Sequence, residues 1–221
     1  MFLARVLSWP YGRVAALYLA GFILLDWLSF IHPFAPFGIT PWNPPTGLSF
    51  ALILLFGQRY MPLLFVAPLL ADLLVRHLPV PIHVEAAMIL ISGVAYGGAT
   101  LFLLRPKRRF DPALASLRDL IRLMVVAAIS TALAAIGAIA ILAAAGLIDP
   151  ADFATATVRL WIGDMIGVAV LTPFLLIIFT RQRLPSLSWE IPMQAATIIA
   201  ALALVFGFTH AYSFQLFYLL F

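Results

Sequence analysis

The sequence predicts an all-α polytopic membrane protein, a bundle of about eight transmembrane helices of which the last is truncated at the C-terminus. Of the 221 residues, 64% are hydrophobic and 10% are charged, whereas soluble globular domains carry about 25% charged residues. Apolar windows of about twenty residues, the length that a helix needs to cross a bilayer, recur along the whole chain. A transmembrane β-barrel would instead show short segments of alternating hydrophobicity.

Composition and motifs also exclude several kinds of site. The chain has no cysteine, which rules out a disulfide, a zinc–thiolate site and a catalytic thiol. The motifs G-x-S-x-G and H-E-x-x-H and a phosphate-binding loop are absent from the sequence. His83 and Glu85 would diverge on a helix, which argues against a metal site. We therefore expect no catalytic residue, no metal and no cofactor in this segment.

The predicted spans follow one another with short connections. The first apolar run follows Arg5 and Arg13 and continues through Asp26 and Trp27 with no signal-peptidase site, so it is a span and not a signal peptide. The predicted bounds are 14–32, 44–56, 60–75, 82–104, 120–148, 159–180 and 191–209, and an eighth span begins at residue 211.

The second span is short and begins in an unusual sequence. The segment "PFAPFGITPWNPPT", residues 33–46, dips toward it. Pro44 and Pro45 suit the first turn of a helix, where no backbone donor is lost, and the side-chain oxygen of Asn43 can cap that helix. Only "GQR", residues 57–59, separates the second span from the third. We expect both to cross the membrane, and a hairpin that does not cross fully is the alternative.

The later spans differ in their side chains. In the fifth, "MVVAAISTALAAIGAIAILAAAG", alanine and glycine recur at spacings of three and four, which predicts a packing helix rather than a ligand site. Tryptophans lie at the start of spans two and six, and Pro62 and Pro192 lie early in spans three and seven. This arrangement suggests a four-span duplication.

Basic residues indicate the orientation. The net charge is +4, and the basic residues lie in the connections, where they report topology rather than a nucleic-acid site. Arg76 and Arg159 fall on one side; the other side carries Arg5, Arg13, Arg59, Arg105, Lys107, Arg108, Arg109, Arg118, Arg122, Arg181 and Arg183. The positive-inside rule then places the N-terminus in the cytoplasm of a bacterial inner membrane, with the basic segment 105–122 at the anionic lipid headgroups.

Polar side chains gather near the outer ends of the predicted spans. Ionisable groups inside a bilayer cost about 2.5–3.5 kcal/mol on insertion scales, so each needs a partner, a wet cavity or a function. All of them lie within about six residues, or about 9 Å, of an outer helix end. We therefore expect a polar pocket open to the periplasm, and its candidate ligand-binding residues are Asp26, Trp42, Asn43, Asp72, Glu85, Arg159, Trp161 and Asp164.

Each of these residues also has a purely structural interpretation. The two tryptophans are then interfacial anchors, and Asn43 is a helix cap. Asp164 forms a hydrogen bond between helices, and Asp26 pairs with another span. The remaining three charged residues are solvated helix ends.

Two stretches resemble one bacterial family. "PWNPPTGLSFALILLFGQRYMPLLFVAPLLADLL", residues 41–74, and "WIGDMIGVAVLTPFLLI", residues 161–177, are similar to the hallmark motifs of membrane-associated sensor domains of the first type, the MASE family. Asn43 stands where that family is expected to have a proline. The resemblance covers most of the chain. It implies a single sensor domain over 1–221 and a cytoplasmic output beyond it, commonly a histidine kinase or a diguanylate cyclase.

The resemblance further implies a sensory function. A small ligand or a membrane-protein partner would occupy the pocket and shift the spans that line it, and the last span would pass this shift to the output of a homodimer. Trp42 and Trp161 would supply apolar faces, while Asn43, Asp72 and Asp164 would supply polar contacts. The segment itself would be no enzyme.

Two other functions are compatible with the same sequence. A bundle with an outer pocket suits the substrate-binding membrane subunit of a small-molecule or vitamin transporter, although no inverted repeat is visible. "IGDMIG", residues 162–167, resembles the motif of intramembrane aspartyl proteases, but Trp161 occupies its first glycine position. That alternative requires Asp26 or Asp72 as a second aspartate near Asp164.

Overall fold

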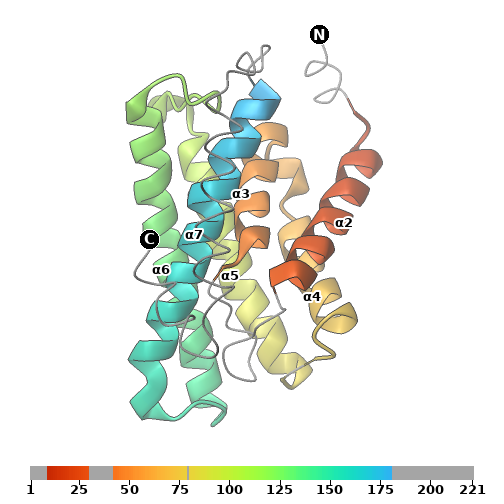
Figure 1. The fold of residues 1–221 in the computed structure, drawn as a ribbon, viewed down its shortest axis with the longest axis vertical. Helices are drawn as coiled ribbons and strands as arrows, with labels where there is room; N and C mark the ends of the chain where they lie inside the picture. The colour runs from red at the N-terminus through yellow and green to blue at the C-terminus, as the bar shows by residue number, and fades with distance from the viewer. Residues whose placement is uncertain (1–8, 30–41, 79, 181–221) are drawn as a thin grey trace, which may run out of the picture. The chain divides into compact units, whose positions relative to one another are not determined.

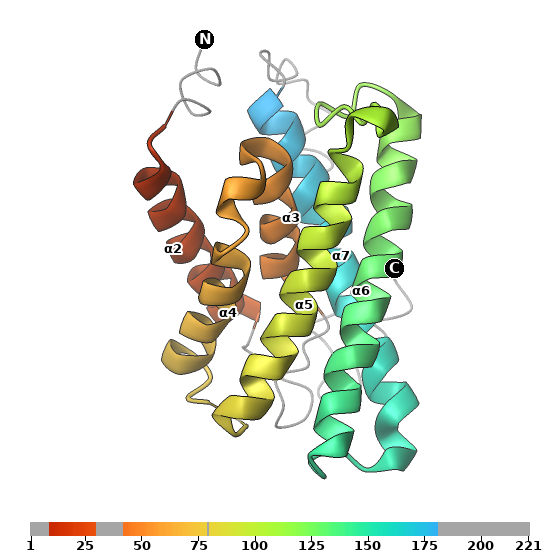
Figure 2. The same cartoon turned by 180° about the vertical axis from the view of Figure 1, so that it is seen from behind.

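The computed structural model describes residues 9–29, 42–78 and 80–180. These residues form six α-helices and no strand, and consecutive helices run in alternating directions (Figures 1 and 2). The helices are α2 (Tyr11–Ser29), α3 (Pro44–Phe56), α4 (Leu63–Leu74), α5 (Ile82–Leu103), α6 (Leu117–Ala144) and α7 (Phe153–Thr180). The all-α prediction is confirmed.

The predicted number of complete crossings is not confirmed. Four helical segments are long and apolar enough to cross a membrane: Tyr11–Ser29, Ile82–Leu103, Leu117–Ala144 and Pro150–Thr180. The helices α3 and α4 have 13 and 12 residues, so they rise only about 20 and 18 Å against a hydrocarbon core of about 30 Å. The expectation that both cross the membrane therefore stays a prediction, with the hairpin as its alternative. The predicted spans at 191–209 and from 211 lie outside the described residues.

Helix ends differ from the predicted bounds because local capping moves them. Ser116 caps α6, and its hydroxyl accepts a hydrogen bond from the Asp119 amide at 3.3 Å. Such a bond pairs one of the backbone N–H groups that have no partner at the start of a helix. At the other end of the bundle Asp149 accepts from the Ala151 amide at 2.8 Å, and a short 3-10 turn at Pro150–Asp152 leads directly into α7. Helix α7 consequently begins six residues before the predicted Arg159.

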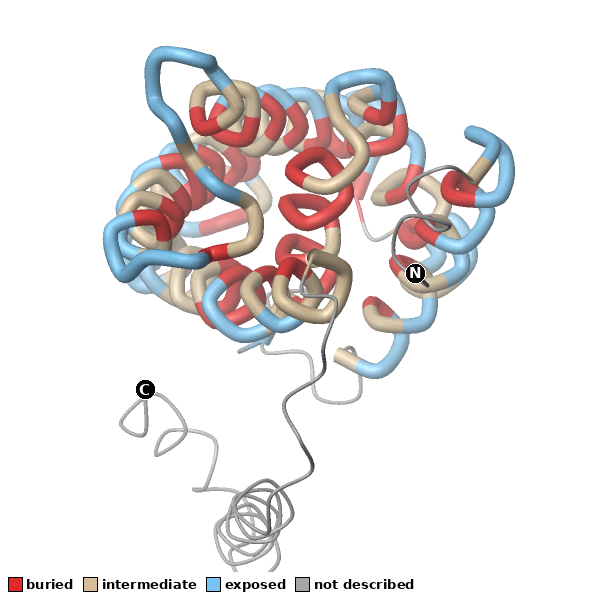
Figure 3. Tube along the Cα trace, turned by 90° about the horizontal axis from the view of Figure 1, so that it is seen from above, coloured by how far each residue is buried: buried red, intermediate tan, exposed pale blue. Residues whose placement is uncertain are grey.

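Helix α3 is buried on nearly all sides. Ten of its 13 residues are buried, and it packs against α2, α5 and α7. The tube coloured by burial shows buried residues facing inward and exposed residues facing outward around the bundle (Figure 3). Because protein surrounds α3, its two prolines, its glycine and its hydroxyl side chains are not exposed to lipid, which is the condition under which such a sequence is tolerated at membrane depth.

Two glycines allow α3 and α7 to approach closely. A Cβ atom on Gly47 would collide with the backbone carbonyl of Gly167, and a Cβ atom on Gly167 would collide with the carbonyl of Asn43. Nearby, the Thr172 hydroxyl donates to the Gly47 carbonyl oxygen at 2.8 Å. Small residues with an interhelical hydrogen bond are typical of close packing in membranes.

The two faces of α6 differ in side-chain size. Small residues along one face are buried, among them Ala127, Ala134 and Ala138, so the predicted packing role is confirmed. The opposite face exposes a ladder of aliphatic side chains at a spacing of about four residues: Leu117, Ile121, Val125, Ile129, Leu133 and Ile136. A continuous exposed apolar stripe of this length suits contact with lipid tails and not with water.

Candidate ligand-binding cavity

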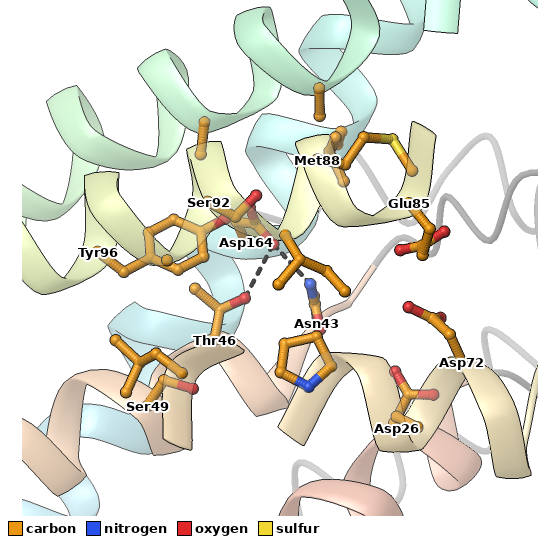
Figure 4. Close-up of a pocket in the computed structure, with 18 of the residues that line it drawn as sticks. Asp26, Asn43, Thr46, Ser49, Asp72, Glu85, Met88, Ser92, Tyr96 and Asp164 are labelled. Carbon is orange, nitrogen blue, oxygen red and sulfur yellow. Dashed lines mark hydrogen bonds between the residues drawn. The ribbon is translucent and has the colours of Figure 1, made fainter. Parts of the chain in front are cut away.

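A cavity of about 150 Å³ lies between the helices, and all six of them contribute to its wall (Figure 4). Its polar lining residues come from α2, α3, α4, α5 and α7. Its apolar lining residues include Met88 and Ile89 of α5, Ala138 and Leu142 of α6, and Leu160 of α7. The fifth predicted span therefore lines the cavity as well as packing, and the expectation that it has no part in a ligand site stays a prediction.

The deeper polar group, which we call the inner cluster, consists of Asn43, Thr46, Tyr96 and Asp164. The carboxylate of Asp164 accepts three hydrogen bonds, from Asn43 Nδ2 at 2.7 Å, from Thr46 Oγ1 at 3.0 Å and from the Tyr96 hydroxyl at 2.5 Å. Asp164 is 1% exposed, and hydrogen bonds to an ionised group are the stronger kind. One side chain of α7 thereby ties together α3 and α5.

The start of α3 explains how Asn43 reaches this position. The Asn43 amide donates to the Gly163 carbonyl oxygen at 3.0 Å, so α3 begins beside the middle of α7 rather than at a membrane surface. The prediction that the Asn43 side chain caps α3 is wrong, because it forms no capping hydrogen bond and its Nδ2 group donates to Asp164 instead. Helix α3 also directs its positive N-terminal end toward this carboxylate.

The second polar group, which we call the outer cluster, consists of Asp26, Asp72, Arg76 and Glu85. Arg76 binds Asp26 through two nitrogens, at 2.5 Å from Nη2 and 3.3 Å from Nε, and its Nη1 lies 3.5 Å from Asp72. Burial acts to lower the pKa of the Arg76 guanidinium, but the carboxylates of Asp26 and Asp72 outweigh it and raise that pKa above its usual value. Arg76 is therefore charged at every physiological pH.

The backbone after α4 brings Arg76 back to the cavity. His77 and Leu78 adopt left-handed conformations with φ of 56° and 53°, and the Leu78 amide donates to the Asp72 carbonyl oxygen at 2.9 Å. Non-glycine residues rarely take positive φ, and the conformation costs free energy. This turn ends α4 and leaves Arg76 one helical turn after Asp72, on the same face.

The two clusters lie at different depths. Asp26 and Asp72 are within three residues of the ends of α2 and α4, and Glu85 is the fourth residue of α5. Asp164 is the twelfth residue of α7, about 17 Å from the start of that helix at 1.5 Å per residue. The expectation of one shared shallow depth is therefore wrong for Asp164, because α7 begins earlier than its hydrophobicity indicates.

The sequence matches the model of a known family. The family model named MASE1 matches residues 12–221, which is nearly the whole chain. The chain belongs to the MASE1 family. This family is a membrane sensor input module of signalling proteins, and it is not catalytic. No curated protein and no solved structure matches the chain.

The two MASE1-like motifs of the sequence meet in the structure. Residues 42–47 of the first motif contact residues 163–167 of the second through the Asn43–Gly163 backbone hydrogen bond and the Gly47–Gly167 approach. The inner cluster is formed where they meet. Asn43, the residue that departs from the expected proline, supplies one of its three donors, a side-chain amide that proline lacks.

Five of the eight predicted site residues line this cavity, namely Asp26, Asn43, Asp72, Glu85 and Asp164. Trp42, Trp161 and Arg159 do not line it. Trp42 is 38% exposed, and the Trp161 indole Nε1 donates to the Ala128 carbonyl oxygen at 3.0 Å, which is a helix-to-helix contact. Arg159 is half-buried on α7, one turn before Gly163.

The aspartates proposed for a protease are engaged elsewhere. Asp26 and Asp72 bind Arg76, while Asp164 is held by an amide and two hydroxyl groups. Nor does any group of three or more histidine and acidic residues suited to a metal ion occur in the described ranges.

Sequence reasoning missed several residues of the wall. Tyr96, Thr46 and Ser92 were absent from the candidates because a single hydroxyl in an apolar helix is indistinguishable from a core residue. Arg76 was counted only as a topological charge. Its spacing of four from Asp72 was a usable signal, since buried carboxylates need a cation and this pair lies on one helix face.

Proposed function

We propose that this MASE1 domain is the ligand-recognition part of a bacterial signalling protein. A small molecule enters the cavity from the periplasm, contacts the outer and inner clusters, and changes the relative positions of the helices that carry them. The change passes along the chain after α7 to a cytoplasmic output, a histidine kinase or a diguanylate cyclase, acting in a homodimer.

The observation that carries this proposal is the cavity itself, which has polar side chains from five helices at its wall. Concave sites with a few convergent polar groups and an apolar remainder are the usual form of small-molecule sites. Since Asp164 bonds to α3 and α5 at once, a ligand that competes for any of its three donors alters contacts between three helices. Such a differential interaction is what a ligand needs to shift a conformational equilibrium.

The distribution of charge supports a periplasmic entrance. The connections at 57–62 and 104–116, which carry basic residues, lie at one end of the bundle, and the ends of α2 and α4 and the start of α5 lie at the other (Figure 1). Asp26, Asp72 and Glu85 belong to these helix ends. By the positive-inside rule the basic end faces the cytoplasm. The outer cluster then opens toward the periplasm of an inner-membrane protein.

Output measurements on the full-length protein test this proposal. Asp164→Asn and Tyr96→Phe each alter the hydrogen bonds of the inner cluster with little change of shape. In membranes with equal protein content, we expect both to change output by about fivefold or more. The output is phosphate incorporation from ATP for a kinase, or cyclic dinucleotide synthesis from GTP for a cyclase. A fivefold change corresponds to a free-energy difference of about 1 kcal/mol.

A matched control is Asp152→Asn, a carboxylate change at the exposed turn before α7, which should leave output unchanged. Parent-like output from both cavity variants, in protein whose melting temperature is also unchanged, would remove the inner cluster from the sensory mechanism.

A further inference from the structure

The outer cluster carries more negative than positive groups. Among the described residues of the cavity wall, Asp26, Asp72 and Glu85 are carboxylates and Arg76 is the cation. Arg76 is already engaged, since it binds Asp26 bidentately and Asp72 at 3.5 Å. One guanidinium neutralises the charge of one carboxylate, so the charges of the other two are not balanced within the described part of the cluster.

Glu85 is the third carboxylate of the outer cluster. Its side chain is on a residue that is 6% exposed, and its carboxyl group points across the cavity at that of Asp72 (Figure 4). Within the described ranges, its side-chain partner is the carboxyl of Asp72. Two facing carboxyl groups in a buried site need either a shared proton or a cation between them, because two carboxylates repel each other.

Apolar side chains complete the lining. Met88, Leu142 and Leu160 line the same cavity, whose volume of about 150 Å³ equals that of apolar cavities able to hold a benzene-sized molecule. A fitting occupant thus has a positive end and a small hydrophobic body. A metal ion fits poorly, because no cluster of three metal-ligating side chains occurs among the described residues.

We propose that the cavity binds a small organic cation whose primary ammonium group lies between Glu85 and Asp72 and whose hydrocarbon part lies against Met88, Leu142 and Leu160. An ammonium group has three donors, so it can bond both carboxylates at once and take the place of a proton shared between Glu85 and Asp72. This inference rests on the proposed function for its biological meaning, but the binding itself is independent of signalling.

Calorimetric titration of the purified full-length protein in nanodiscs tests the binding. The probes are n-butylammonium, 1-butanol and butyrate, which share a four-carbon body and differ in charge. We expect saturable binding of butylammonium, at least tenfold weaker binding of 1-butanol, and none of butyrate. Glu85→Gln, which keeps the shape, should weaken butylammonium at least tenfold, and Asp152→Asn should not change it.

Equal binding of butylammonium and 1-butanol by the parent protein would overturn the proposal, and this comparison needs no variant to fold. An unchanged affinity of Glu85→Gln for butylammonium would overturn it too. The two carboxyl groups would then be explained by a proton shared between them and not by a bound cation. If the parent protein does not bind butylammonium but its output still changes in Asp164→Asn, only the ligand class is refuted. If it binds butylammonium but its output does not change in Asp164→Asn, only the sensory mechanism is refuted.

Discussion

At the scale of single residues, the site depends on how buried carboxylates are compensated. Asp164 accepts hydrogen bonds from three neutral donors, Asp26 binds an arginine through two nitrogens, and Glu85 faces the carboxyl of Asp72. These are three different environments for the same functional group within one cavity. The first two connect neighbouring segments, and the third is where we propose that the ammonium group of an occupant binds.

Replacement of Arg76 should reveal how strongly the outer cluster depends on it. Arg76→Gln leaves Asp26 and Asp72 buried without their cation, and breaking a buried ion pair costs about 3–5 kcal/mol. For a domain of this size we expect the melting temperature in detergent to fall by about 6–20 °C. Adding Asp26→Asn to Arg76→Gln should recover part of this loss, since it removes one unpaired charge.

The exposed Arg118 offers a control for that experiment, and Arg118→Gln should stay within about 0.5 kcal/mol of the parent. A melting temperature for Arg76→Gln equal to that of Arg118→Gln would show that the ion pairs contribute nothing to stability.

At the scale of helices, the sequence predicted which segments are helical much better than where they end. The runs at 82–104 and 120–148 are long and uniformly apolar, and α5 and α6 match them to within four residues. The start of α7 was missed because "FATATV" is not apolar enough to mark a span, although it continues the helix toward the exposed turn. Capping by Asp149 and Pro150 determines that boundary.

The site was predictable where residues are charged and not where they are merely polar. A carboxylate in an apolar run stands out by its cost, which is why four of the five confirmed lining residues are acidic. Tyr96 and Thr46 carry no such signal. Their role depends on α3 and α5 facing α7, a pairing between segments far apart in sequence that no local pattern reveals.

The crossing of α3 and α7 gives a prediction at this scale. Gly167→Ala places a methyl group against the Asn43 carbonyl, and because both partners are backbone the helices must separate, at about 1–3 kcal/mol. Gly98→Ala is the matched control on α5, where a Cβ atom meets nothing within 4 Å, and it should be neutral or stabilise by about 0.5–1 kcal/mol. Thermal unfolding of both variants measures the difference, and equal melting temperatures would contradict close packing at Gly167.

At the scale of the whole molecule, the proposed orientation in the membrane rests on the separation of charge between the two ends of the bundle. The cysteine-free sequence makes it directly measurable. In intact bacteria whose outer membrane has been made permeable, a maleimide that cannot cross the inner membrane should label Asp152→Cys. It should label Lys107→Cys only after the inner membrane is also disrupted. The reverse pattern would invert the proposed topology and place the outer cluster in the cytoplasm.

The close approach of Gly47 and Gly167 limits which parts of the bundle can be displaced independently. Backbone touches backbone there, and the Thr172 and Asn43 bonds fasten the same two segments on either side. We therefore expect α3 to follow α7 as one rigid pair in any rearrangement. In the proposed orientation, the binding of a ligand near the outer cluster would then move the cytoplasmic surface at two points, the end of α7 and Gly57 at the end of α3.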